Sequence, residues 1–284
     1  MDCVDEVEKI YSVLGERASN CRIVLRLWVD DSHSKCPLSS KFGCMESEIE
    51  GIMEACKNHN MQVVGVAFHV GSGSSDNTAY SKAIANAKKA FDIGKKHGFE
   101  MNLLDFGGGW PGTLADKDYH NAWLEGASKD IDASLKEHGF DNIENIKYMS
   151  EPGRYFNNLT IDVACYVINV QERDGVMIYR INEGVDGIFK DHKLTDELTF
   201  DVETWAEGEC YKTVFVGPSG KSYDVIDHLG SKGNHRDIML PRLKVGDPVL
   251  FRNIGSYTVS LSNILLREHQ QHCYLIRESS LSSI

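Results

Sequence analysis

The sequence has no C-x-x-C pair, no basic segment at its start, and no apolar run of about 18 residues, the length that a membrane helix needs. Without closely spaced cysteines, neither a zinc site nor a redox dithiol is indicated, and no metal site is predicted. The eight cysteines are expected to be reduced and mostly buried. The acidic stretch from Met1 to Glu8 is unlike a signal or transit peptide, which favours a cytoplasmic location.

The composition is that of an ordinary globular protein. Of 284 residues, 42% are hydrophobic and 25% are charged, which allows one large domain or two smaller ones. A formal net charge of −12 argues against nucleic acid or an anionic membrane surface as a partner.

The first 160 residues alternate short apolar runs with helical patterns. This alternation predicts parallel β/α architecture, and the near-continuous apolar runs predict strands that are buried on both faces. The expected strands are residues 23–28, 63–70, 101–106 and 146–150. The expected helices between them are residues 46–58, 78–97 and 118–138.

After residue 160 the strands follow one another without helices. The expected strands are residues 161–170, 176–181, 211–216, 248–251 and 272–276. This pattern predicts a separate, mostly antiparallel β domain. The expected domains are therefore residues 1–160 and 161–284.

Three successive strands of the first region are followed by glycine-rich or charged segments. His69 to Gly73 follow the second strand, Gly107 to Gly109 follow the third, and Glu151 to Arg154 follow the fourth. In a β/α barrel these strand ends open on one face, where glycine N–H groups, the Ser72 hydroxyl and the Arg154 guanidinium could bind a phosphate. Each segment alone could instead be a tight turn, a structural histidine, or a surface ion pair between Glu151 and Arg154.

Several motifs together resemble the alanine-racemase-type decarboxylases that depend on pyridoxal phosphate, specifically the ornithine decarboxylase family. They occupy residues 68–73, 103–112, 151–155, 217–219 and 255–258, and the similarity spans about residues 4–277. The resemblance implies an α/β plus all-β fold: the C-terminal half of an alanine-racemase-like (β/α)8 TIM barrel, followed by a β-sandwich or barrel-like domain. It also implies pyridoxal 5'-phosphate as the cofactor.

The resemblance assigns roles to individual residues. Glu151 would face the pyridine nitrogen and His69 would stack on the cofactor ring, and both are expected to be catalytic together with Asp191, which matches a family carboxylate near the substrate. The expected phosphate-binding positions are Ser72, Gly107, Gly108, Gly109, Arg154 and Tyr257. Arg26 and Lys41 match basic positions lining the barrel, with Arg26 expected at the cofactor; both could equally be buried partners of acidic residues.

Two departures from the family pattern stand out. The family lysine that binds the cofactor covalently lies upstream of the first residue here, and Lys147 and Lys190 fall at other positions. In a loop that reaches the partner's site in this family, cysteine and aspartate are replaced by Gly220 and Lys221. A lysine there would repel the distal ammonium of ornithine.

The resemblance implies decarboxylation of L-ornithine or a similar basic amino acid to the amine, in polyamine biosynthesis, with catalysis impaired by the missing lysine. The alternative is a regulatory pseudoenzyme, similar to antizyme inhibitor, that acts by protein–protein contact. A third reading, a barrel for another phosphorylated ligand, is also open. A half barrel would expose strand edges, so we expect a fragment or a partner that completes the sheet. A homodimer or a heterodimer with a full-length homologue is expected, and antizyme is an open candidate partner.

Overall fold

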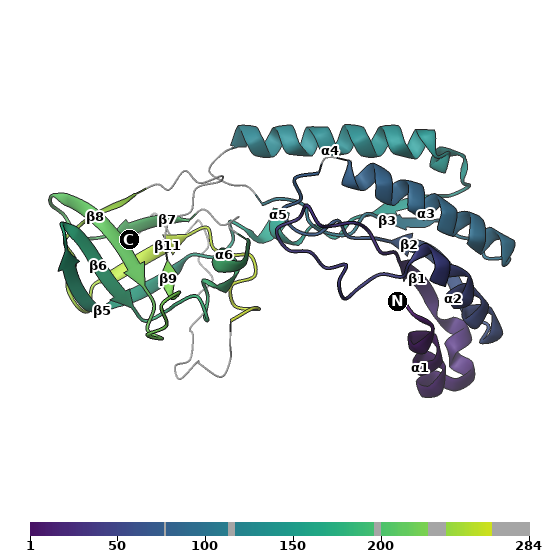
Figure 1. Cartoon of the computed structure of the whole chain (residues 1–284), viewed down its shortest axis with the longest axis horizontal. Coiled ribbons are helices and arrows are strands. Elements are labelled where there is room, and N and C mark those ends of the chain that lie inside the picture. The colour runs from purple at the N-terminus through teal and green to yellow at the C-terminus, as the bar shows by residue number, and fades with distance from the viewer. Residues whose placement is uncertain (77, 113–116, 196–199, 227–236, 263–284) are drawn as a thin grey trace, which may run out of the picture.

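Two regions with separate hydrophobic cores follow one another along the chain in the computed structural model (Figure 1). The structure describes residues 1–76, 78–112, 117–195, 200–226 and 237–262. The first core is built from residues between Val7 and Phe140, and the second from residues between Cys165 and Ile254. The two cores are consistent with the division near residue 160, which stays a prediction.

The first region is a parallel sheet in the order β1-β2-β3-β4, with helices between the strands. In chain order the elements are α1 (Val4–Leu14), η1 (Gly15–Asn20), β1 (Arg22–Arg26), α2 (Glu46–Asn58), β2 (Gln62–Ala67), α3 (Ala79–Lys96), β3 (Leu103–Asp105), α4 (Lys117–Glu137), η2 (Phe140–Asn142) and β4 (Lys147–Met149). The predicted parallel β/α architecture is confirmed, with helix bounds within one residue of those expected.

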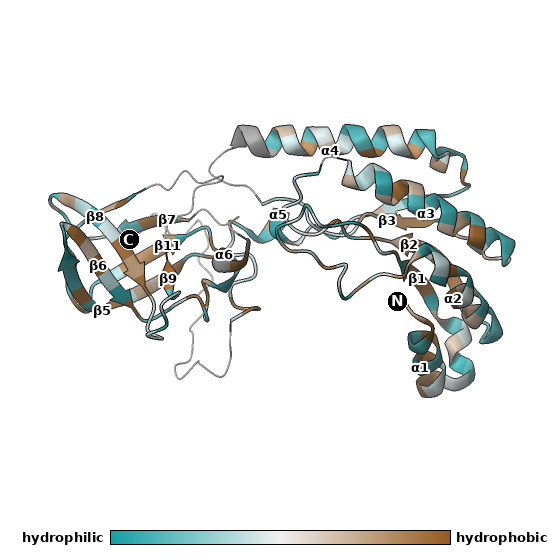
Figure 2. Cartoon of the chain, viewed as in Figure 1, coloured by the Kyte–Doolittle hydropathy of each residue, from teal (hydrophilic) through white to brown (hydrophobic). Residues whose placement is uncertain are grey.

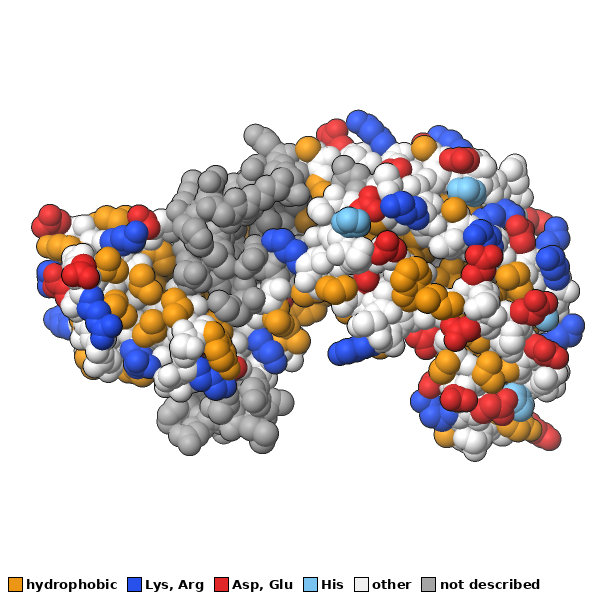
Figure 3. Space-filling model, viewed as in Figure 1, with side chains coloured by type: hydrophobic (Ala, Val, Ile, Leu, Met, Phe, Trp, Pro, Cys, Tyr) orange, Lys and Arg blue, Asp and Glu red, His pale blue; other side chains and the backbone are white. Residues whose placement is uncertain are grey.

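Helices α1 to α4 lie along one face of this sheet (Figure 1). Their apolar positions recur at helical spacing and pack on the strands, as Ile49 and Met53 of α2 and Ile84 of α3 do. Acidic and basic side chains are mixed over the outer surface of this region (Figure 3). In Figure 2 the brown stripes of the helices therefore alternate with hydrophilic faces.

The prediction that all four strands are buried on both faces is wrong. All three residues of β4 are exposed, with Tyr148 at 42% and Met149 at 43%. In β1, buried Ile23 and Leu25 alternate with less buried neighbours. The reason is that, within the described residues, helices cover only one face of the sheet, and the strand order ends at β1 and β4.

The second region is built on one seven-stranded sheet. After α5 (Gly153–Asn157) come β5 (Val163–Arg173), β6 (Val176–Ile181), α6 (Lys190–Thr195), β7 (Asp201–Thr204), β8 (Cys210–Val216), β9 (Val225–Ile226), β10 (Ile238–Pro241) and β11 (Pro248–Arg252). The strand order is β10-β8-β6-β5-β11-β7, with β9 beside β8, and only the β6–β8 pair is parallel.

The core of the second region is aromatic. Phe251 packs against Phe189, Phe200 and Phe215, with ring centroids 4.8, 5.4 and 5.3 Å away. The mostly antiparallel β architecture expected after residue 160 is thus confirmed, although α6 and the short strands β7, β9 and β10 were not predicted. The expected strand at residues 272–276 lies outside the described residues.

The structure also bears on the burial of the cysteines and on membrane-spanning helices. Of the seven described cysteines, all free, only Cys44, Cys56 and Cys165 are buried, so the expectation that most are buried is wrong. The reason is local: Cys3 immediately precedes α1, and Cys210 begins β8, so both are exposed. None of the helices in the described ranges is long and apolar enough to cross a membrane.

Candidate functional site

The glycine triplet after β3 packs directly against the loop after β2. A Cβ on Gly107 would overlap the Phe68 carbonyl oxygen, and one on Gly109 would overlap the Gly71 carbonyl oxygen. The φ angles of +66° and +89° at these two glycines are ones that L side chains rarely adopt. Close packing and backbone conformation both require glycine here, so the triplet brings bare backbone to the edge of the sheet.

The same triplet contacts the His69 side chain on one neighbouring segment and the Glu151 backbone on the other. A Cβ on Gly108 would lie 2.7 Å from His69 Nε2 and 3.1 Å from the Glu151 carbonyl oxygen. The Glu151 N–H donates to the Gly107 carbonyl at 2.8 Å. The ends of β2, β3 and β4 therefore meet at one place, as the sequence predicted from the rule that parallel strands open on the same face.

His69 lies in a setting that keeps its imidazole neutral. Its Nδ1 accepts a hydrogen bond from the Gly71 N–H at 2.9 Å, so the ring proton is assigned to Nε2. Burial and, to a smaller extent, the Arg26 charge together lower the pKa of His69 to about 4, with Asp31 opposing the shift. At neutral pH the ring is an uncharged, partly buried face beside Gly108.

The pKa of Glu151 is shifted upward, in the opposite direction to that of His69. Burial raises the pKa of the Glu151 carboxyl, the nearby Asp105 raises it further through charge and a hydrogen bond, and Arg26 lowers it. Asp105 is only 2% exposed and accepts the Gly107 N–H at 2.9 Å. A cationic group placed against Glu151 would therefore stabilise the carboxylate form of this side chain.

Sequence reasoning missed Asp105 as a member of the site. The residue stands inside the matched motif at residues 103–112 and near the end of the strand expected over residues 101–106. An acidic residue at the last position of an apolar parallel strand was the available signal, because such positions lie at the edge where the other site residues gather.

Arg154 and Asp191 form a buried ion pair that the sequence did not predict. The two guanidinium nitrogens of Arg154 lie 2.7 and 3.0 Å from the Asp191 carboxylate oxygens, and the side chains are 5% and 3% exposed. The pair joins α5 to α6. The alternative reading of Arg154 as part of a surface pair with Glu151 does not describe this buried, bidentate arrangement.

Tyr257 completes this part of the site. The Arg154 guanidinium carbon lies 5.1 Å from the centre of the Tyr257 ring, and the Tyr257 hydroxyl would be 2.9 Å from a Cβ on Gly153. A Cβ on Gly112 would lie 2.9 Å from Arg154 Cγ. The loop that begins with the glycine triplet thus runs from His69 to Arg154 and connects the two groups of residues.

A loop preceding α2 covers the Ser72 turn. The Ser72 carbonyl accepts the N–H groups of Lys35 and Cys36 at 2.9 and 3.2 Å, and the Ser72 side chain is half-buried. Ser34 in this loop has a buried hydroxyl without a hydrogen-bond partner among the described residues, directly beside Gly71. The region therefore holds an unsatisfied polar atom next to the bare glycine backbone.

The two basic residues matched to barrel-lining positions differ. Arg26 is half-buried at the end of β1, with its guanidinium 4.8 Å from the centre of the Phe42 ring, and its charge reaches both His69 and Glu151. Lys41 is exposed, so its alternative role as a buried partner of an acidic residue is wrong. Its place at the tip of an exposed turn explains the difference.

Comparison with known proteins identifies the family. Residues 1–158 match the family model described as "Pyridoxal-dependent decarboxylase, pyridoxal binding domain". Ornithine decarboxylase of Schizosaccharomyces pombe is 33% identical over 275 residues, covering 91% of this chain and 58% of that protein. Antizyme inhibitor 2 of Xenopus laevis is 32% identical over 275 residues, covering 91% of this chain and 57% of that protein.

Solved structures agree with this assignment. Arginine decarboxylase of Paramecium bursaria Chlorella virus superposes with a TM-score of 0.75 at 30% identity, covering 93% of this chain and 66% of that one. The chain spans less than two thirds of the length of the curated relatives named above. The predicted fold class, part of an α/β barrel followed by a β domain, is confirmed. The chain belongs to the ornithine decarboxylase family of pyridoxal-dependent decarboxylases.

Proposed function

We propose that this chain carries the pyridoxal phosphate site of a decarboxylase acting on a basic amino acid, ornithine or a close analogue. One observation carries the proposal: Gly107 to Gly109 contact His69, Glu151 and the Gly71 turn at a single edge of the parallel sheet. The family to which the chain belongs supplies the cofactor class.

The residues present fit the phosphate of that cofactor. The bare backbone of the glycine triplet and of Gly71 admits close approach of an anion, and the Ser72 and Ser34 hydroxyls and the Arg154 guanidinium are suited to its oxygens. Tyr257 beside Arg154 completes the set of proposed phosphate-binding residues.

The ring would be held by His69 and Glu151. The neutral imidazole of His69 offers a flat face without adding a second positive charge beside a protonated pyridine. Glu151, whose pKa is raised by burial, gains stability as a carboxylate when such a cation lies against it, so it holds the proton on the ring nitrogen. Once bound there, the cofactor supplies the electron sink for loss of the substrate carboxylate.

Arg26 and Asp191 have supporting places in this proposal. Arg26 lies near both Glu151 and His69, and its charge favours the carboxylate form of Glu151. The proposed substrate contact of Asp191 is kept, and its buried pair with Arg154 gives it a second role, which is to orient the guanidinium. Because one carboxylate then serves both tasks, changes at Asp191 should affect cofactor and substrate together.

Calorimetric titration of the full chain tests the proposal, with pyridoxal phosphate and with pyridoxal, which lacks the phosphate. Arg154→Gln should weaken pyridoxal phosphate binding by about tenfold or more and leave pyridoxal binding nearly unchanged, because a charged hydrogen bond to phosphate contributes about 1.5–3 kcal/mol. Glu151→Gln should weaken the binding of both ligands, because both contain the pyridine ring.

Lys41→Gln is the matched control, because Lys41 is exposed and its replacement also removes one positive charge. It should leave both affinities unchanged. Equal loss of pyridoxal phosphate binding in Lys41→Gln and Arg154→Gln would mean that only overall charge matters, and would reject the assigned phosphate site. A chain that binds neither ligand would reject the proposal as a whole.

A regulatory protein without catalysis is the second candidate. The sequence identity to antizyme inhibitor 2, 32%, is close to the 33% identity to ornithine decarboxylase, and Lys221, in place of the family aspartate, pairs with Asp186 at 2.8 Å. In this candidate the chain acts by contact with a homologue or with antizyme in polyamine control, and a dimer is proposed in either case. Release of carbon dioxide from carboxyl-labelled ornithine, lysine or arginine by the chain alone would exclude it.

A further inference from the structure

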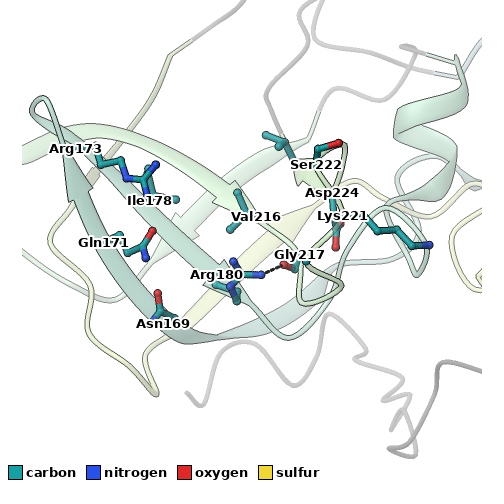
Figure 4. A pocket seen from close by; sticks show the side chains of 12 residues that line it. Asn169, Gln171, Arg173, Ile178, Arg180, Val216, Gly217, Lys221, Ser222 and Asp224 are labelled. Atoms are coloured by element: carbon teal, nitrogen blue, oxygen red, sulfur yellow. Dashed lines mark hydrogen bonds between the residues drawn. The ribbon is translucent and has the colours of Figure 1, made fainter.

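The outward face of the second region's sheet carries a concave pocket. On β5, β6 and β8, side chains such as Tyr179 and Phe215 point into the aromatic core, and alternate residues point outward. On the outward face Gln171 lies opposite Ile178, and Arg180 lies beside Val216. Together with the turn after β8, these residues line a pocket of about 290 Å³ (Figure 4).

The pocket is positively charged although the chain as a whole is acidic. Arg173, Arg180 and Lys221 line it, against a formal net charge of −12 for the chain. Across the described parts of the chain, neither Arg173 nor Arg180 forms an ion pair with a carboxylate. Lys221 is paired with Asp186, so the uncompensated charge lies on the two arginines.

Arg180 is held in position by a neutral group. Its guanidinium donates to the Gly217 carbonyl at 2.9 Å, drawn as a dashed line in Figure 4, and the side chain is half-buried. This bond fixes the direction of the guanidinium without cancelling its charge, and it leaves other N–H donors for a ligand. An arginine fixed in advance loses less side-chain entropy when it binds an anion.

The acidic residue that lines the pocket does not compete for these arginines. Asp224 is buried, and its carboxylate accepts the N–H groups of Val185 and Ser219 at 2.9 and 3.0 Å and the Ser219 hydroxyl at 2.5 Å. These hydrogen bonds to Asp224 stabilise the turn after β8. The accessible charged donors therefore remain those of arginine.

The two arginines stand at opposite ends of an uncharged floor. Arg180 is opposite Asn169, four residues along β5 from Arg173, which places the two backbone positions roughly 13 Å apart along the strands. Ile178, Val216 and the Gln171 amide lie between them. We propose that this pocket binds a small molecule with two anionic groups separated by a short apolar chain, of the α,ω-dicarboxylate class.

Titration of the full chain with adipate tests this inference, with acetate and the diamine cadaverine as comparison ligands. Adipate should bind at least tenfold more tightly than acetate, and cadaverine should not bind at this pocket. Arg173→Gln and Arg180→Gln should each weaken adipate binding about tenfold, the loss of one charged hydrogen bond. Added salt should weaken the binding as well.

Arg242→Gln is the control variant, because Arg242 is exposed, pairs with Glu172 at 3.0 Å and stacks on Tyr211, outside the pocket. It removes the same charge and should leave adipate affinity unchanged. Circular dichroism of each variant should match the unchanged chain. If adipate does not bind at concentrations up to about 10 mM, the inference is overturned, because one charged hydrogen bond alone would give a dissociation constant of about that size. Equal effects of Arg242→Gln and Arg180→Gln also overturn it.

Discussion

The two sheets of this molecule bury their apolar faces in different ways. The seven-stranded sheet folds around its own phenylalanine core and keeps polar and charged side chains on its outer face. The parallel sheet buries one face under helices, while its last strand, β4, stays exposed. Glycine backbone and functional side chains gather at the carboxyl ends of β2, β3 and β4, so in this sheet the candidate site lies at the strand ends and not on the face that the helices cover.

The largest expected effect comes from the glycine triplet. Gly107→Ala should lower the stability of the first region by at least about 3 kcal/mol, because the Cβ would overlap the Phe68 carbonyl and φ is +66°. Hydrogen exchange should show the loss in β2 and β3, with the second region unchanged. Gly126→Ala in α4, where an added Cβ meets nothing within 4 Å, should be neutral or stabilising. Equal behaviour of the two variants would contradict the close packing described.

The ion pair between α5 and α6 should have the next largest effect. Asp191→Asn removes the carboxylate charge that faces the buried Arg154 guanidinium, and should cost about 3 kcal/mol in urea unfolding. Asp186→Asn, which removes the exposed pair with Lys221, should cost less than about 1 kcal/mol. If both variants lose the same stability, the buried pair does not contribute as its geometry indicates.

His69 should give the first region a distinct pH dependence. Its pKa is about 4 in the folded chain against 6.5 for an ordinary histidine, so the unfolded chain binds the extra proton first as pH falls. Folding stability should therefore decrease from pH 6.5 to pH 4, by up to about 3 kcal/mol from this residue. In His69→Gln, stability measured across that window should fall less steeply, and an unchanged slope would show that burial of the imidazole has no such effect.

The smallest expected effect is on the exposed strand. Met149→Ser should change stability by less than about 0.5 kcal/mol, because Met149 is 43% exposed. Val66→Ser on β2 places a hydroxyl in a fully buried site and should cost several times more. Thermal unfolding of both variants compares the edge strand with a central one. A large loss of stability in Met149→Ser would contradict the exposure of this strand.

Much of the architecture was predictable from periodicity. The bounds of α2, α3 and α4 followed from apolar positions at helical spacing, and β6 was predicted to the residue. The exposure of β4 was not predictable in this way, because an apolar run shows that a strand can be buried and not whether anything covers it. The short strands β7, β9 and β10 carry too few residues for a pattern.

The candidate site was predictable as a set of motifs, but not as a set of contacts. The rule that parallel strands end on one face brings His69, Gly108 and Glu151 together, and the structure places them in contact. The Arg154–Asp191 pair joins residues 37 positions apart in two different regions, and nothing in either local sequence specifies the pairing. The role of Asp105 could not be predicted from the apolar run alone, because the run does not show at which residue the strand ends.

Hydrogen exchange of the full chain with and without pyridoxal phosphate tests whether three segments form one binding site. The segments that would hold this ligand are far apart in the sequence: the turn at Gly71 and Ser72, the loop Gly107 to Gly109, and the start of α5 at Gly153 and Arg154. The amides of all three segments should gain protection together at the same ligand concentration. Protection of one segment alone, or only of amides in the β5–β11 sheet, would contradict a single site at these strand ends.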